Sequence, residues 1–381
     1  MPEQHKINEK GIRRTPLYEE HLKMKGRMIE FAGYELPVWY TSQVDEHLFT
    51  RKSCGIFDLT HMGEIIFSGP KALQTIDRLV SNNAAKLNVG EAQYSLLMND
   101  RGGMVDDLIT YRLADDVYLW VINGANVEKD VAWVASKVPE KGIWRHRSYF
   151  TSLIAVQGPK AEEIVDKVVP DANVKNMPYF GLKWIWQDDE KWLTVARTGY
   201  TGEDGFEIIV SNNLAVDFWR KIFAIAGDSA KPIGLAARDT LRLEMCYSLY
   251  GNDITDDTNP FEANLGWVVK LKNRNFSSSE ILKRFKDEGL KQKLVGLKPE
   301  GKSAARHNDE IWFEGKKIGF VTSGSFGPSV GANIALGYVP IELSEVGNIV
   351  QIKIPDKLKK CDKLINAPIV PTPFVEPHTK K

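Results

Sequence analysis

The sequence predicts an α+β protein in which two duplicated sheet-and-helix halves are followed by a small C-terminal β-barrel domain. Two observations support this prediction. Residues 65–72 (IIFSGPKA) are echoed by residues 154–161 (IAVQGPKA), and each run is typical of a strand followed by Gly-Pro and an amphipathic helix. Beyond residue 293, short apolar strands alternate with Gly and Pro turns, a pattern that favours a small all-β domain.

In the first half, the strand at 63–68 is followed by helical spacing of Leu73, Ile76, Leu79 and Val80. The pattern then predicts strands at 92–98, 104–113 and 117–123, with a hairpin loop at 99–103. A helix over about 126–138 closes this half.

The second half repeats that order, with strands at 191–197 and 206–210 around a Gly-rich connection and a helix over 215–226. Each half can bury one face of its sheet, and the two can meet at a shared cleft. A short helix pattern lies in the polar stretch 273–292. We therefore expect one region of two interleaved halves at 15–272 and a separate barrel at 293–376.

Composition excludes several classes of protein. Lys plus Arg and Asp plus Glu each number 50 and the pI is about 7.1, so no basic field favours nucleic acid. No apolar run approaches the roughly 20 residues that span a bilayer. The N-terminal residues lack the pattern of a signal or transit peptide, and the three cysteines show no pairing or metal-type spacing. These features favour a cytoplasmic protein without a membrane partner.

A pair of acids, Asp106 and Asp107, follows the hairpin 99–103 on an otherwise apolar strand. A carboxylate directed into a covered sheet face needs a partner or a purpose. Strand alternation places the two aspartates on opposite faces of nearly equal hydrophobicity, so periodicity does not choose between them. Taken by itself, the pair favours a structural interpretation, with hairpin stabilisation and a surface ion pair.

Two runs in the second half are further candidates for a binding site. Residues 198–207 combine glycines, aromatic residues and acids, which allows the backbone to approach a planar ligand closely. The helix predicted at 234–244 places Arg238 and Arg242 on one face, where each needs an acid or an anionic ligand. A plain Gly-rich hairpin and a surface salt-bridge network are the competing interpretations. No His or Cys spacing indicates a metal site, and the glycine spacing fits neither common phosphate-binding loop.

Taken together, these runs resemble the aminomethyltransferase, or T-protein, family of the glycine cleavage system from about residue 15 to residue 375. The resemblance rests on many ordered motifs: Thr15-Pro16-Leu17-Tyr18, Phe31-Ala32-Gly33-Tyr34, His61-Met62-Gly63, Gly102 to Leu108, Arg197 to Glu207, Gly234 to Glu244, Leu249-Tyr250-Gly251-Asn252-Asp253 and Val321-Thr322-Ser323-Gly324.

The resemblance implies a central cleft that holds tetrahydrofolate. It selects the second acid of the pair, Asp107, as the catalytic carboxylate. It further implies that Glu207 and Arg238 bind the folate and that three other residues line the same cleft: Tyr94, Asn123 and Tyr200. A carboxylate opposite the N–H groups of a pterin is suitable chemistry for Glu207.

The implied reaction takes the aminomethyl group from the lipoyl arm of H-protein, releases ammonia and leaves 5,10-methylenetetrahydrofolate. The alternative on the same fold is a folate-dependent demethylase of a small methylated compound. The sequence also departs from some family members, because Val375 stands where they carry a tyrosine after Pro-Phe. That departure puts one hydrogen bond to the folate in question.

Overall fold

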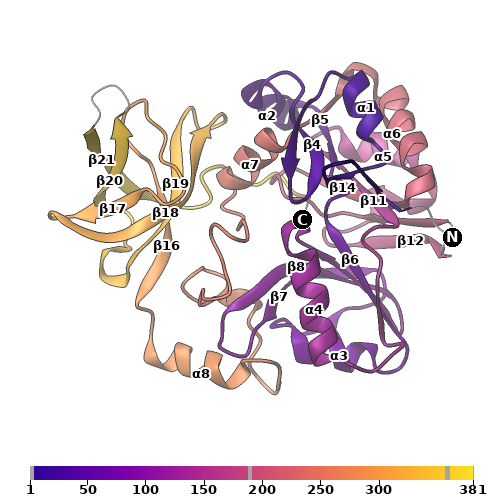
Figure 1. Cartoon of the computed structure of the whole chain (residues 1–381), viewed down its shortest axis with the longest axis horizontal. Helices are drawn as coiled ribbons and strands as arrows, with labels where there is room; N and C mark the ends of the chain where they lie inside the picture. Colours follow the sequence, from indigo (N-terminus) through magenta and orange to yellow (C-terminus); the bar gives the residue numbers. More distant parts are fainter. Residues whose placement is uncertain (1–3, 188–190, 357–360, 381) are drawn as a thin grey trace. The chain divides into compact units, whose positions relative to one another are not determined.

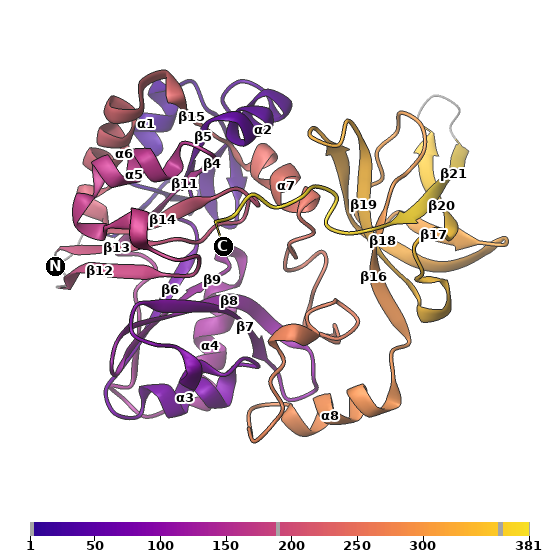
Figure 2. The same ribbon diagram turned by 180° about the vertical axis from the view of Figure 1, so that it is seen from behind.

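The computed structural model describes residues 4–187, 191–356 and 361–380 and confirms the α+β class. The chain forms two compact units. The first contains Met1–Ser95, Asp106–Arg238 and His378–Lys381, and the second contains Leu96–Val105 and Asp239–Pro377. Figure 1 labels the elements in chain order, and Figure 2 shows them from behind.

The first half forms a five-stranded sheet packed against two helices (Figure 1). Its strand order is β10 (Trp144–His146), β6 (Gly63–Ser68), β9 (Val117–Ile122), β8 (Met104–Ala114) and β7 (Glu91–Met98). The helices are α3 (Ala72–Leu79), which packs on β6 and β9, and α4 (Val127–Lys137). These bounds confirm the strands and helices that apolar periodicity predicts for this half.

The second half forms a six-stranded sheet with the order β12 (Leu182–Gln187), β13 (Trp192–Ala196), β14 (Gly205–Ser211), β11 (Thr151–Gln157), β5 (Cys54–Asp58) and β15 (Ala230–Pro232). Helices α5 (Ala161–Val168) and α6 (Asn212–Ala226) pack on β11 and β14, where Trp219 is fully buried. Helix α6 begins three residues before the predicted start, because its first turn holds polar Asn212 and Asn213, which apolar periodicity does not detect.

The two sheets share one topology, which confirms the predicted duplication. In each half the first strand pairs with the fourth, the fourth with the third and the third with the second: β6-β9-β8-β7 and β11-β14-β13-β12. The halves also exchange a strand. Strand β5, which precedes β6 in the chain, pairs with β11, and β10, which precedes β11, pairs with β6. Since each sheet is completed by a strand from the other half, the halves are interleaved.

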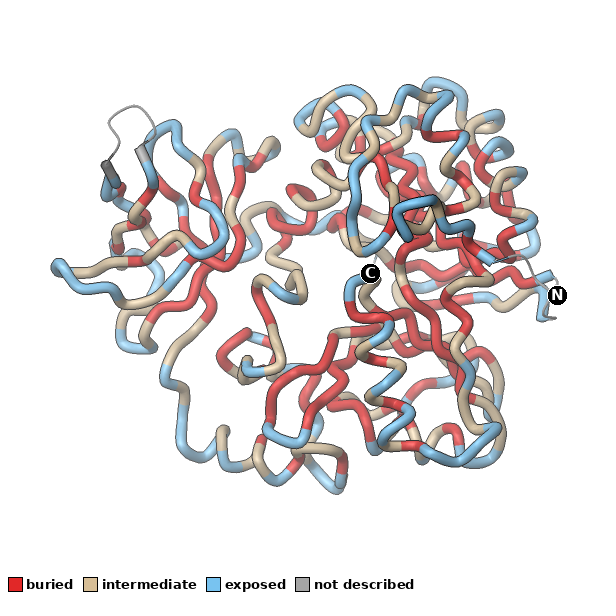
Figure 3. Tube along the Cα trace, viewed as in Figure 1, coloured by how far each residue is buried: buried red, intermediate tan, exposed pale blue. Residues whose placement is uncertain are grey.

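The rest of the first unit surrounds these sheets. A four-stranded sheet has the order β1 (Lys6–Ile7), β2 (Arg13–Arg14), β4 (Tyr34–Trp39) and β3 (Arg27–Phe31). Two helices accompany it, α1 (Tyr18–Lys23) and α2 (Gln43–Lys52), and α7 (Leu235–Glu244) follows β15. Figure 3 shows that the strands of the two large sheets are mostly buried, whereas the helices expose one side.

The second unit contains helix α8 (Ser279–Glu288) and a closed six-stranded barrel, as the sequence predicts. The barrel order is β16 (Gln292–Leu297), β19 (Ala332–Pro340), β18 (Lys316–Gly327), β17 (Glu310–Phe313), β20 (Ile349–Asp356) and β21 (Cys361–Val370), with β21 pairing again with β16. Its interior is aliphatic, with Val295, Ile311 and Ile352 among the buried residues. Closure leaves the barrel without an open edge.

A buried carboxylate ties the end of α7 to the barrel within this unit. Asp253 is fully buried and accepts a charge-assisted bond of 2.6 Å from Arg242 Nη1. Its other oxygen accepts from the hydroxyls of Thr322 and Ser323 at 2.5 and 2.8 Å. The Leu249 amide donates to the same carboxylate at 2.9 Å. Removing such an acceptor leaves several buried donors without their bonds.

We therefore predict that Asp253→Ala lowers the free energy of unfolding by about 3 kcal/mol, because it removes the acceptor of a buried ion pair. Equilibrium denaturation with urea measures this difference. The matched control is Asp257→Ala, whose side chain is 87% exposed and pairs at 3.2 Å with Arg101. That exposed pair is worth at most about 0.5 kcal/mol. Equal losses in the two variants would contradict a structural role for Asp253.

Candidate active site

The structure separates the two aspartates that strand alternation leaves equivalent. Both lie at the beginning of β8, just after the hairpin, and their side chains project to opposite faces of the sheet. Asp106 is fully buried, whereas Asp107 is only partly buried. Among the described residues, neither forms the surface ion pair of the structural interpretation. Asp107 accepts from Tyr94 and Asn123, and Asp106 accepts from two asparagine side chains and one backbone amide.

Asp107 is held by side chains from two other elements. The Tyr94 hydroxyl, on β7, donates to Oδ2 at 2.9 Å. The Asn123 amide, just after β9, donates to Oδ1 at 2.8 Å. Because one donor lies on each side, the plane of the carboxylate is fixed. The structure thus brings three of the predicted site residues into direct contact.

The environment of Asp107 disfavours its charge. Burial, followed by the negative charge of the neighbouring Asp106, raises the pKa of Asp107 to about 7. The hydrogen bonds from Tyr94 and Asn123 act in the opposite direction. A carboxyl group in this balance changes between acid and anion close to neutral pH, and such perturbed groups mark candidate functional sites.

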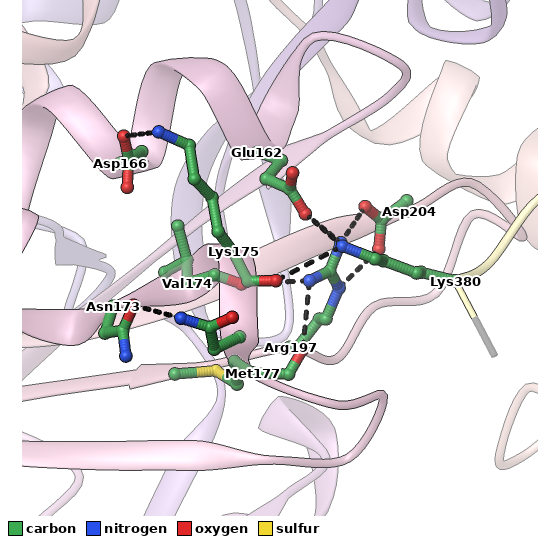
Figure 4. Close-up of polar contacts among 10 residues, drawn as sticks. Glu162, Asp166, Asn173, Val174, Lys175, Met177, Arg197, Asp204 and Lys380 are labelled. Atoms are coloured by element: carbon green, nitrogen blue, oxygen red, sulfur yellow. Dashed lines mark hydrogen bonds and ion pairs between the residues drawn. The ribbon is translucent and has the colours of Figure 1, made fainter.

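The Gly-rich connection between β13 and β14 is closed at its base by Arg197, which is fully buried. Its Nε and Nη2 donate to the two oxygens of Asp204 at 2.8 and 2.5 Å, and Nη2 also donates to Glu162 at 2.7 Å (Figure 4). Nη1 donates to the carbonyl oxygens of Val174 and Met177. The planar guanidinium of arginine presents several N–H donors in a fixed geometry, so one side chain can bind all these acceptors at the base of the loop. The connection is therefore a braced loop.

Within the loop, the glycines make room for a side chain. Gln157, at the end of β11, donates to the Thr198 carbonyl at 3.0 Å and accepts from the Thr201 hydroxyl at 2.9 Å. A Cβ atom at Gly199 would lie 2.0 Å from Gln157 Oε1, and one at Gly205 would lie 2.5 Å from its Nε2. The close approach that the glycines permit at these two positions is thus to Gln157.

This braced loop carries Tyr200, whose ring lies against Arg238. The Arg238 guanidinium carbon is 4.6 Å from the centre of the Tyr200 ring, a cation–π geometry. Arg238 also lines a small pocket with Asp58 and the backbone around Gly234. Its charge acts on the buried His61: burial first and Arg238 second lower the pKa of that imidazole to about 3, so His61 is neutral. The structure therefore brings Tyr200 and Arg238 together.

Glu207 lies on β14 and has two partners that sequence patterns do not identify. The Thr198 hydroxyl donates to Glu207 Oε2 at 2.5 Å, and the Tyr111 hydroxyl donates to the same oxygen at 3.4 Å. Tyr111 lies on β8 four residues after Asp107, so a period of two places both on one face of the strand. Glu207 is also partly exposed, which leaves its carboxylate open to a ligand.

The six predicted residues share one property, because every one of them is partly buried: Tyr94, Asp107, Asn123, Tyr200, Glu207 and Arg238. All belong to the first unit. They form three groups: Asp107 with its two donors, the Tyr200–Arg238 stack, and Glu207 with Tyr111 and Thr198. Phenol rings next to carboxylates and a guanidinium suit a flat polar ligand with both donor and acceptor edges. No cluster of His, Cys, Asp or Glu in the described ranges is arranged to hold a metal ion.

Comparisons with known proteins show the family to which the two parts of the chain are similar. The GCVT N-terminal domain matches residues 17–273, and the glycine cleavage T-protein C-terminal barrel domain matches residues 292–376. An aminomethyltransferase of Halothermothrix orenii is 39% identical over 365 residues, which cover 96% of this chain and 100% of the relative. One from Flavobacterium psychrophilum is 43% identical over 365 residues, with 95% and 99% covered.

The fold has a counterpart among solved structures. The crystal structure of glycine cleavage system aminomethyltransferase T from Bartonella henselae matches with a TM-score of 0.88 and 34% sequence identity. The match covers 97% of this chain and 100% of that one. The similarity therefore extends over both units and is not limited to one domain.

The raised pKa of Asp107 has a consequence for stability. Between the ordinary aspartate pKa of about 4 and its folded value of about 7, the native state binds a proton that the unfolded chain has released. Stability then falls as pH rises through this window. We predict that Asp107→Asn unfolds with a free energy about 1 to 2 kcal/mol higher than wild type at neutral pH, the difference disappearing near pH 4.

Urea denaturation of both proteins across this pH range measures the difference. Asp115→Asn is the control, because its side chain is 97% exposed on the loop after β8 and its substitution should leave stability unchanged at every pH. A pH-independent difference between Asp107→Asn and wild type would show that Asp107 titrates normally.

Proposed function

This chain belongs to the glycine cleavage T-protein family and is an aminomethyltransferase, and on this premise we propose that it transfers the methylene carbon of an aminomethyl group from lipoylated H-protein to tetrahydrofolate. The products are 5,10-methylenetetrahydrofolate, ammonia and the dihydrolipoyl arm. The observation that carries the proposal is the Asp107 carboxylate, which Tyr94 and Asn123 hold in one orientation at a partly exposed position.

We propose Asp107 as the catalytic carboxylate. In this transfer, N5 of tetrahydrofolate attacks the aminomethyl carbon and ammonia leaves. The C–S bond to the lipoyl arm then breaks, so positive charge develops on the carbon and N5, until N10 attacks that carbon and its proton passes to the thiolate. A fixed anion stabilises such charge and orients the ring that bears it. Because its donors on β7 and after β9 are already in place, Asp107 needs no rearrangement to do this.

For the folate itself, we propose Glu207 and Arg238 as binding residues and Tyr94, Asn123 and Tyr200 as residues that line the same site. Glu207 presents an acceptor to adjacent ring N–H groups, while Thr198 and Tyr111 hold its orientation. Arg238, stacked on Tyr200, presents a cation that suits a carbonyl or carboxylate of the ligand.

The partner and compartment form part of the same proposal. Lipoylated H-protein would deliver the aminomethyl group, and the reaction would take place in the cytoplasm. Among the described residues, no helix is long and apolar enough to cross a membrane. A folate-dependent demethylase on the same fold is not favoured, because the full-length relatives are named aminomethyltransferases.

The direct test mixes the purified protein with tetrahydrofolate and aminomethylated H-protein and follows ammonia and methylenetetrahydrofolate. We expect both products in equal amounts, and neither when H-protein lacks its lipoyl group. Demethylation of a small methylated compound, with no product from H-protein, would overturn the proposal in favour of the demethylase.

Kinetics of two variants test the choice of carboxylate. We predict that Asp107→Asn folds and binds folate but loses on the order of 100-fold in kcat, because an amide supplies no negative charge to the transition state. Asp106→Asn should retain more activity, since its carboxylate does not reach the exposed face. Single-turnover assays and folate titration separate the two effects. A larger loss in Asp106→Asn would show that the other aspartate is catalytic.

A further inference from the structure

Behind Asp107, on the opposite face of β8, lies a pair of acids that the proposed reaction does not use. Asp106 comes from β8 and Asp130 from α4, and both are fully buried. Their carboxyl groups are within hydrogen-bonding distance of each other. Two carboxylates in contact cannot both keep a full charge at neutral pH away from water.

The available donors are distributed very unequally between the two acids. Asp106 accepts from the Asn123 backbone amide and from Asn123 Nδ2, each at 2.9 Å, and from the Asn126 side-chain amide. Asp130 accepts from no N–H or O–H donor among the described residues, although both its oxygens are buried. The donors stabilise a charge on Asp106, whereas Asp130 has the environment of a neutral acid.

A neutral Asp130 can satisfy both groups with a single proton. Its hydroxyl then donates to Asp106, which gives the pair one shared proton and one negative charge. Burial, and next the Asp106 charge, raise the pKa of Asp130 well above its usual range, in agreement with this assignment. Lys129 is the cation that acts on Asp130, and its influence is smaller than those two.

Asn123 links this pair to the exposed carboxylate. Its Nδ2 lies 2.9 Å from Asp106 Oδ1, 2.8 Å from Asp107 Oδ1 and 3.0 Å from the Asp107 carbonyl oxygen. An amide nitrogen carries two hydrogens, so three acceptors compete for two N–H bonds. The charge on Asp106 therefore influences how firmly Asn123 holds Asp107, and it also acts directly on Asp107 through space.

We infer that Asp106 and Asp130 form a singly protonated acid pair, with the proton on Asp130, and that this pair is a positioning element that sets both the orientation of Asn123 and the ionisation of Asp107. The part of the inference that concerns Asp107 rests on its proposed catalytic role. The shared proton itself does not depend on that role.

The charged and titratable groups around the pair come from three elements. Strand β8 contributes Asp107, α4 contributes Lys129, and β7 contributes Tyr94, whose hydroxyl donates to Asp107 and on which the Asp106 charge also acts. Tyr94 is neutral at these pH values, because burial and Asp107 raise its pKa. The pair therefore acts on Asp107 as a single negative charge, because the proton that the two acids share leaves only one of them ionised.

Infrared spectroscopy detects the shared proton without any assay of activity. At about pH 9 ordinary aspartates are ionised. We expect the wild-type protein to keep one carboxylic-acid C=O band that shifts when aspartate is labelled with ¹³C. Labelling only aspartate also excludes Glu64 as the source of the band, which is necessary because burial raises the pKa of Glu64 to about 8. The band should be absent from Asp130→Asn. Wild-type protein without a label-sensitive band would overturn the inference, even if no variant folded.

The pH dependence of kcat tests the positioning role. Asp107 must be ionised to act, so kcat should rise with a midpoint near its pKa of about 7. Asp106→Asn removes a negative charge and should lower that midpoint by about one pH unit. In Asp130→Leu, Asp106 loses the hydrogen bond that does most to oppose the effect of burial on its pKa, so protonation of Asp106 is favoured and the midpoint should fall in the same direction.

Asp130→Asn is the discriminating variant, because asparagine keeps a neutral donor at the same place. Its midpoint should remain at the wild-type value while that of Asp130→Leu falls. If the kcat midpoint of Asp130→Asn falls as far as that of Asp106→Asn, Asp130 is ionised in the wild-type protein. If the midpoint of Asp130→Leu stays at the wild-type value, Asp130 does not act on Asp107. Either result overturns the inference. A protein inactive with H-protein would still give the infrared result, so failure of the proposed function is recognised separately.

Discussion

The site depends on one amide group, that of Asn123, which lies between two carboxylates on opposite faces of the same strand. Its Nδ2 contacts the side chains of Asp106 and Asp107 and the Asp107 carbonyl oxygen, while its own backbone amide donates to Asp106. A neutral donor in this position allows two neighbouring acids to exist in a poorly solvated place without a cation between them. A lysine there would form an ion pair with Asp107 and offset the negative charge that the proposed reaction uses. Asparagine fixes the geometry and leaves the charge intact.

The duplicated halves can be compared at the position of Asn123. In the first half, Ile122 pairs with Gly63 and Leu108. In the second half, Val210 occupies the equivalent position and pairs with Ser152 and Leu193. Asn123 therefore corresponds to Ser211, and Asp107 corresponds to Trp192. In the second half, Ser211 Oγ accepts a bond from the Trp192 backbone amide at 2.7 Å. Both halves thus tie the end of the fourth strand to the backbone of the third. Among the described residues, the first half adds the carboxylates of Asp106 and Asp107 at this position, and Trp192 stands at the position of Asp107 in the second half.

Much of the fold follows from local patterns, whereas the site depends on contacts between distant residues. Apolar periodicity predicts α4 within one residue and most strands of both halves, because each element buries an apolar face, but it does not predict β12. The exchange of β5 and β10 leaves no local signal, since pairing across the halves is set by tertiary packing. For the same reason, alternation places Asp106 and Asp107 on opposite faces without indicating which face α4 covers. The roles of Gln157 and Tyr111 likewise arise only when β11, β14 and β8 lie together.

The residues of the candidate site are partly buried, and for Asp107 this partial burial has a physical reason. An Asp107 buried without hydrogen-bond donors would keep its proton, as Asp130 is inferred to do, and a fully exposed one would ionise at low pH but could not be held by Tyr94 and Asn123. Burial and the Asp106 charge, opposed by the hydrogen bonds from Tyr94 and Asn123, place the pKa of Asp107 at about 7, close to neutral pH. Glu207 is held by donors of its own, the hydroxyl groups of Thr198 and Tyr111. One strand, β8, provides both Asp107 and Tyr111, so the two carboxylates are positioned by a single rigid element, and a ligand bound to one has a defined position relative to the other.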